Sequence, residues 1–110
     1  MTVTYSEFKK LDMRVGKILH VSRVPDSDNL YAIDVSIGTQ QPLHIVSSLV
    51  PYYSEQELLG MDIIVLVNLE TAKIRGEQSE GMLLAAETED SSQCVLITPA
   101  SAIPAGTKIL

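Results

Sequence analysis

Lys73 and Arg75 stand one residue apart in the stretch 68–81, which lies between two apolar segments of an acidic chain. Arginine fits phosphate with a planar two-pronged donor, whereas lysine acts as a mobile point charge. Gly76 and Gly81 follow the pair and permit close backbone approach and unusual dihedral angles. The stretch therefore has the side chains and the backbone freedom that binding of phosphate requires.

Three further side chains near this pair could contact a nucleic acid. Asn68 carries donor and acceptor groups suited to a base edge, Ser79 could donate to phosphate or ribose, and Met82 offers a polarizable surface to a base. A second interpretation stays open. In it, Lys73 and Arg75 form a solvated loop balanced by nearby glutamates, the glycines serve turn geometry, and Met82 belongs to the core.

The distribution of charge along the chain bears on both interpretations. The net charge of −6 argues by itself against a nucleic-acid partner, because phosphate is repelled by an acidic surface. However, five of the eight lysines and arginines, Lys17 among them, lie within residues 9–23, two lie in the 68–81 stretch, and residues 42–70 contain none. Binding of a polyanion requires that the fold bring the two basic segments together.

Length and composition indicate one domain, residues 1–110, with no apolar run near the roughly 18 residues that span a bilayer. The first residues lack the basic head and apolar middle of a signal peptide. Cys94 is the only cysteine, so a cytoplasmic protein with a reduced thiol is expected. His20 and His44 have no cysteine or histidine neighbours in sequence. We find no nucleophile with an adjacent base, and expect no metal, no cofactor and no enzymatic activity.

Hydrophobic alternation and turn-forming residues predict the elements. A short helical turn is expected at 4–11. A capping box of Ser54 and Glu57 predicts a helix of about two turns that ends at Gly60. Gly16 inside the first strand predicts a bulge or a sharp bend. Strands are expected at 13–24, 30–38, 43–50, 62–68, 81–87 and 94–98, with a possible edge strand in the tail 99–110.

This order of elements is typical of an all-β, five-stranded barrel of the oligonucleotide/oligosaccharide-binding type (OB-fold), with a short helix between strands 3 and 4 and a C-terminal extension. An antiparallel sheet without a binding face would give much the same pattern. In the barrel, residues 68–81 form the loop between strands 4 and 5, one of two loops that frame the binding face. Tryptophan is absent and phenylalanine occurs once, which favours a shaped RNA over general single-strand binding.

Five segments carry a resemblance to a known family. The most specific segment is 67–86. Within it, the informative feature is the spacing of Asn68-Leu69, Lys73, Arg75-Gly76, Ser79 and Gly81-Met82. On these motifs the chain resembles the tRNA-binding domain family, which includes C-terminal domains or beta subunits of methionyl-tRNA synthetases and small stand-alone dimeric proteins. The segments are "LDMRVGKI" (11–18), "PDSDNLY" (25–31), "IVSSLVPYYSEQELLG" (45–60), "VNLETAKIRGEQSEGMLLAA" (67–86) and "PAG" (104–106).

The resemblance implies a non-catalytic protein that recognises tRNA by its shape and phosphate backbone, near the elbow or acceptor side. It implies a homodimer formed with the C-terminal extension, a stand-alone protein, and methionyl-tRNA synthetase as a possible partner. The RNA contacts that it implies are Asn68, Lys73, Arg75, Ser79 and Met82, with Lys17 as a further candidate.

A protein-interaction or chaperone module on the same barrel is the alternative function. The net acidity favours it, as does Asn29, which stands where related chains commonly have lysine. Glu70 and Thr71 likewise stand where Lys-Pro or a similar pair is frequent, so a negative charge lies beside the expected site. Against this alternative, the related chaperone branch generally lacks the "GMLLA" sequence found at 81–85.

Overall fold

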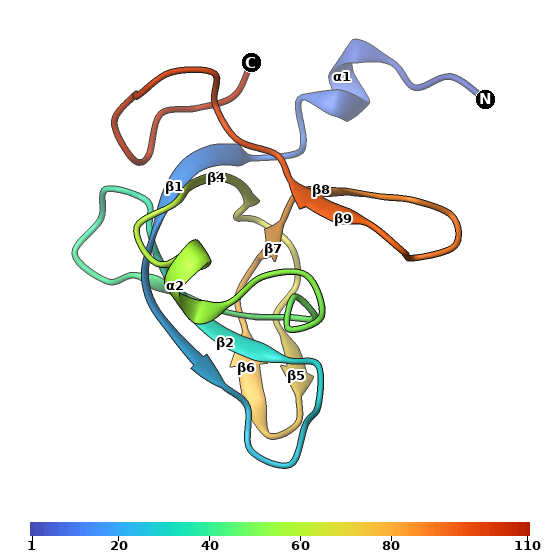
Figure 1. Ribbon diagram of the computed structural model, residues 1–110. Helices are drawn as coiled ribbons and strands as arrows, with labels where there is room; N and C mark the ends of the chain where they lie inside the picture. Colours follow the sequence, from blue (N-terminus) through green and yellow to red (C-terminus); the bar gives the residue numbers. More distant parts are fainter.

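Five antiparallel strands surround an apolar core, in the order β3-β2-β1-β4-β7. Figure 1 shows how β1, β2, β4 and β7 curve around it. The computed structural model describes residues 1–110. Hydrogen bonds between the β3 segment and residues 79–80 close most of the remaining gap, so the sheet forms a nearly closed barrel of the OB type, as predicted. The barrel strands are β1 (Met13–Arg23), β2 (Tyr31–Ser36), β3 (Leu43–Ser47), β4 (Asp62–Leu66) and β7 (Met82–Leu83).

Alternating apolar residues of these strands fill the barrel, because successive side chains of a strand point to opposite faces. Tyr31 is among the buried residues, so it packs in the core and offers no stacking surface. The largest fully buried side chains are Ile18, Val24, Ile33, Val35, Ile45, Leu58, Ile63 and Val65.

Gly16 has a packing role that the prediction of a bulge missed. A Cβ atom at this position would lie 2.6 Å from Cγ1 of Val35, so only glycine allows β1 and β2 this close approach. The irregularity in β1 lies further along, between Ile18 and His20, where its pairing with β2 shifts register. Glycine is needed at this position because the narrow interior of the barrel leaves no room for a side chain.

The short helix α2 (Glu55–Leu58) lies between β3 and β4, as expected. The Ser54 hydroxyl accepts from the Glu57 amide at 3.1 Å, and the Glu57 carboxylate accepts from the Ser54 amide at 2.8 Å, which confirms the capping box. The helix has one turn and not two, because Leu59 is extended and Gly60 has a φ of +84°.

Two segments differ from the prediction in their detail. The basic loop contains a small hairpin of β5 (Ala72–Ile74) and β6 (Glu77–Ser79). The strand expected at 81–87 is split, because β7 pairs with β4 and β8 (Ala85–Glu87) pairs with β9 (Cys94–Leu96) outside the barrel.

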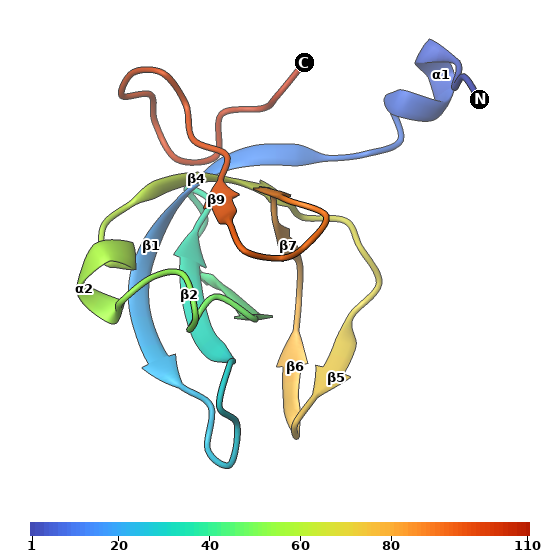
Figure 2. The ribbon, with the colours of Figure 1, turned by 45° about the vertical axis from the view of Figure 1, so that its right-hand side comes forward.

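The N-terminal helix α1 (Tyr5–Phe8), the β8–β9 arm and the C-terminal tail all lie at one end of the barrel (Figure 2). The tail runs beside the start of β1, where it forms a single bridge between Arg14 and Lys108 in place of the possible edge strand. The β5–β6 hairpin and the loop 24–30 lie at the opposite end. No helix has the length and apolar character needed to cross a membrane.

Candidate nucleic-acid interface

The β5–β6 hairpin presents the two loop cations. Ile74 and Glu77 pair across the turn, and Arg75 and Gly76 connect them with φ angles of +52° and +83°. Positive φ at both central residues is typical of the type I′ turn, which matches the right-handed twist of the two strands. Glycine adopts this conformation freely, but arginine adopts it at a cost of about 1 kcal/mol.

His44 of β3 fixes the hairpin against the barrel. Its Nε2 lies 2.7 Å from the carboxylate of Glu77, and its Nδ1 lies 2.9 Å from the carboxylate of Asp34 on β2. The backbone N–H of His44 donates to the Glu80 carboxylate at 2.8 Å. The hydrogen bond to Asp34, together with that to Glu77, holds the pKa of His44 above its ordinary value, although partial burial opposes the shift.

The glutamates of the hairpin region therefore do not neutralise its cations. Glu77 and Glu80 are bound to His44, and neither Lys73 nor Arg75 takes part in an ion pair. Lys73 is exposed and has no hydrogen bond, and Arg75 donates only to the backbone carbonyl of Asp26 at 3.2 Å. No carboxylate contacts either cation, so both side chains face solvent without direct neutralisation.

Arg23 is a third cation at the same end, and sequence reasoning missed it as a site residue. At the end of β1, it donates to the carbonyl of Asp28 at 3.3 Å, so Arg23 and Arg75 both hold the loop 24–30. Its position just before the first flanking loop was the available signal. The carboxylates of Asp26 and Asp28 stand on this loop, and the surface is therefore mixed in charge.

Lys17 does not join these cations. Its Nζ lies 2.9 Å from the carboxylate of Asp62 and 3.3 Å from the carbonyl of Gly60, beside α2. Arg23 lies six residues further along the extended strand than Lys17, which is roughly 20 Å. The first basic segment reaches the hairpin through Arg23 and not, as we expected, through Lys17.

Asn68 and Ser79 use their polar atoms within the protein. The Asn68 amide accepts from the N–H of Asp12 at 2.9 Å and donates to the carbonyl of Lys10 at 2.7 Å. The hydroxyl of Ser79, which is buried, accepts from the N–H of Val46 at 3.0 Å and lies 3.4 Å from the carbonyl of Gly81. Sequence reveals the hydrogen-bonding capacity of a side chain, but the fold selects its partner.

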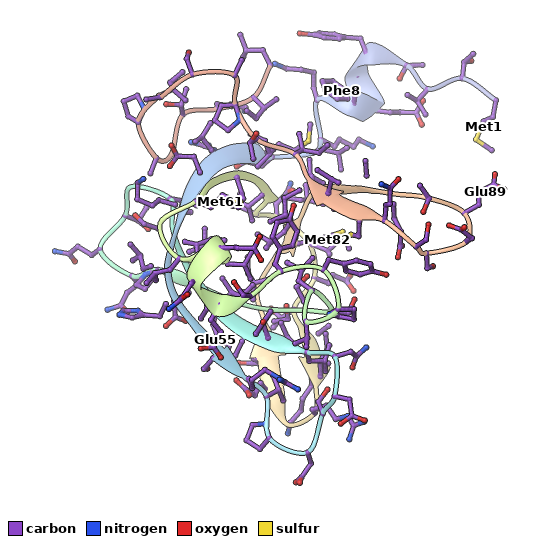
Figure 3. The ribbon with its side chains drawn as sticks, in the orientation of Figure 1. Met1, Phe8, Glu55, Met61, Met82 and Glu89 are labelled. Atoms are coloured by element: carbon purple, nitrogen blue, oxygen red, sulfur yellow. The ribbon has the colours of Figure 1, made fainter.

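Met82 has 49% of its surface exposed, so it is available to a ligand and is not a core residue. It lies above the β5–β6 hairpin in the view of Figure 3. Its side chain borders a cleft of about 130 Å³ between β3 and the hairpin, which is the face where barrels of this type bind ligands.

These features define a class, the small OB-type barrel with a cationic hairpin beside its binding face. The chain matches the family described as "Putative tRNA binding domain" over residues 13–108, and it belongs to this family. The match confirms the resemblance that the motifs indicated. It also extends from the start of β1 to the tail residue that bridges Arg14, so it includes the whole barrel.

The chain is also similar in sequence or in structure to individual proteins. The chain is 44% identical over 107 residues to a methionine–tRNA ligase of Nanoarchaeum equitans, covering 97% of this chain and only 13% of that protein. The crystal structure of a MetRS-related protein from Pyrococcus horikoshii matches with a TM-score of 0.92 and 30% identity, over 100% of this chain and 99% of the other. A CsaA chaperone protein from Picrophilus torridus matches with a TM-score of 0.87 and 30% identity, over 99% and 100%.

Proposed function

We propose that this domain binds tRNA without catalysing a reaction, and that it recognises the shape and the phosphate backbone of the RNA. The observation that carries the proposal is the hairpin itself. It presents Lys73 and Arg75 free of carboxylate contacts, on a turn that is fixed to the barrel by His44. Membership of the tRNA-binding domain family supports tRNA as the ligand.

Each candidate residue has a role in this proposal. Lys73 and Arg75 contact phosphates, and Met82 lies against a base or a sugar. Ser79 acts by positioning the hairpin against β3, and Asn68 acts by joining the start of the loop to residues 10–12, since their polar atoms already have protein partners. Lys17 contributes at long range, because direct contact with RNA requires it to leave Asp62.

The small number of cations limits the affinity. With Arg23 included, about three phosphate contacts give a slope of roughly −2 to −3 for the logarithm of the binding constant against the logarithm of salt concentration. The acidic remainder of the surface repels RNA from other faces and so orients it on the hairpin.

Titration of labelled tRNA into the wild-type protein and into a Lys73→Glu/Arg75→Glu variant tests the proposal. We expect the variant to lose affinity by about tenfold or more and to give a smaller salt slope. The matched control is Lys9→Glu/Lys10→Glu, which changes the net charge equally beside α1, at the opposite end of the barrel. Equal binding by the wild type and the hairpin variant would remove the hairpin from the function.

A peptide-binding or chaperone function is the second candidate, and the likeness to the CsaA chaperone protein favours it. Its test is suppression of the aggregation of an unfolded polypeptide in the same buffers. Suppression without any tRNA binding at low salt would establish this candidate over the first.

The domain has two proposed protein partners. We propose that a second copy of the chain covers the exposed apolar side chains of β9 and the tail, and that methionyl-tRNA synthetase is a partner protein. The likeness to a methionine–tRNA ligase and to a MetRS-related protein supports the second of these partners. Co-purification of a synthetase with the tagged protein from its native host tests it.

A further inference from the structure

The cleft between β3 and the hairpin is apolar and open to solvent. Leu69 and Met82 form its exposed rim, and Leu83 is buried beneath it. Ala72 and Ile74 line the side that belongs to β5. The polar side chains of the cleft are few, and the hydroxyl of Ser79 is already bound to the backbone of Val46.

The cleft, with a volume of about 130 Å³ and one side open to solvent, has room for part of a planar ring system against its apolar lining. An engineered apolar cavity of about 150 Å³ stays dry and binds benzene. The sulfur of Met82 also favours a ring, because thioether sulfur makes attractive contacts with aromatic systems. A flat, unpaired base therefore fits better here than a sugar or a phosphate.

Glu70 is the only charged residue that lines the cleft, and its exposed carboxylate has no hydrogen bond or ion pair. A carboxylate only accepts hydrogen bonds, and it does so from two donors at once. Among the four bases, guanine alone has two adjacent donors, N1–H and the N2 amino group, on its Watson–Crick edge. Adenine, cytosine and uracil offer a single donor group there.

We propose that this cleft binds one unpaired guanine of the RNA, with the ring against Met82 and Leu69 and the Watson–Crick edge on Glu70. The inference rests on the proposed binding of RNA. An RNA occupant is favoured over an aromatic residue of a peptide because β5, which forms a wall of the cleft, also carries Lys73. Lys73 alternates with the cleft residues Ala72 and Ile74, so an RNA strand that crosses the edge of β5 brings its phosphate to Lys73.

Filling the cleft tests the inference on whole tRNA. Ala72→Leu places a larger side chain in the cleft and leaves every cation unchanged. We expect about tenfold weaker binding, within the range of effects for the loss of one stacked base, and an unchanged salt slope. The matched control is Ala86→Leu on β8, which makes the same substitution at an exposed position outside the cleft and away from Lys73. Unfolding in urea establishes that both variants are folded.

The base preference is tested with mononucleotides, by amide NMR shifts of the wild type and of Glu70→Gln. We expect GMP to perturb the amides of residues 69, 70 and 82 more strongly than AMP, CMP or UMP, since all four carry the same phosphate. IMP, which lacks the N2 amino group, should bind more weakly than GMP. Glu70→Gln should remove the preference for GMP.

The outcomes separate the two proposals. If Ala72→Leu binds tRNA as the wild type does, or if GMP perturbs these amides no more than AMP, the guanine site is overturned while the binding of tRNA stands. If N-acetylphenylalaninamide perturbs these amides and GMP does not, the cleft is a peptide site. If the wild type binds no tRNA at all, the proposed function fails before the cleft is considered.

Discussion

Arg75 occupies a turn position at which another residue type would make the protein more stable. Asn-Gly is the preferred pair for a type I′ turn, because asparagine tolerates positive φ better than other non-glycine residues do. This chain places arginine there, with a φ of +52°. Arginine at a strained backbone position, with a side chain that makes one backbone contact, is difficult to explain by stability and is consistent with a role in binding.

Arg75→Asn should therefore separate stability from binding. We expect the free energy of unfolding to rise by up to about 1 kcal/mol, because asparagine relieves the backbone strain, while tRNA affinity falls. Urea denaturation and a tRNA titration measure the two effects. A loss of stability without a loss of affinity would show that the Asp26 contact, and not RNA, explains the arginine.

Ser79→Ala distinguishes a positioning role from an RNA contact. The substitution leaves the buried N–H of Val46 without its partner, so we expect the free energy of unfolding to fall by about 1–3 kcal/mol. Where the variant is fully folded, its salt slope for tRNA should equal that of the wild type. A stable variant with weakened binding would instead place the hydroxyl on the RNA.

At the scale of elements, the hairpin depends on the barrel for its position. Three strands contribute to its attachment: Asp34 from β2, His44 from β3 and Glu77 from β6. His20 of β1 also approaches Asp34, at 3.6 Å, so a second imidazole faces the same carboxylate. A change of charge on His44 therefore acts on the element that carries Lys73.

This attachment should weaken as pH rises. The pKa of His44 is raised in the folded state, so its contribution to stability is present below the unfolded value of about 6.5 and is lost as pH rises through the folded value. We expect exchange of the Glu80 amide, which donates to the His44 carbonyl, to accelerate over this window beyond the intrinsic effect of pH. In His44→Gln this extra acceleration should be absent. Equal pH profiles for the two proteins would contradict the prediction.

At the scale of the whole molecule, the two surfaces proposed for binding lie at opposite ends. The hairpin that carries Lys73 and Arg75 lies at the end opposite the β8–β9 arm and both termini (Figure 2). Lys9 and Lys10, beside α1 at the arm's end, also have no ion pair, but that end differs in carrying several exposed apolar side chains. These apolar side chains are Val95, Ile97, Ile103 and Leu110. Tyr52 and Tyr53 hold the arm in place, through hydrogen bonds to the Ser91 carbonyl and the Leu96 amide.

We expect sedimentation equilibrium to give twice the chain mass of 12.0 kDa. Val95→Asp should shift the protein toward monomer, because Val95 is 57% exposed on β9 and a charge there resists burial in an interface. Gln93→Asp, on the same arm, adds the same charge without removing an apolar side chain. A monomeric wild type, or a dimer unaffected by Val95→Asp, would exclude this surface as the interface.

The sequence by itself predicted the barrel, the capped helix and the basic loop, although not the hairpin within that loop, because alternation, capping and turn residues act over a few neighbouring positions. It also determined the family, through the motif spacing between Asn68 and Met82. Only the tertiary structure decided which polar groups are free. In the fold, Asn68 and Ser79 form hydrogen bonds with backbone groups, and Lys17 pairs with Asp62. Arg23 lies at the same end as the hairpin, where it binds the loop 24–30. These outcomes depend on contacts between residues far apart in the chain, which local patterns cannot specify.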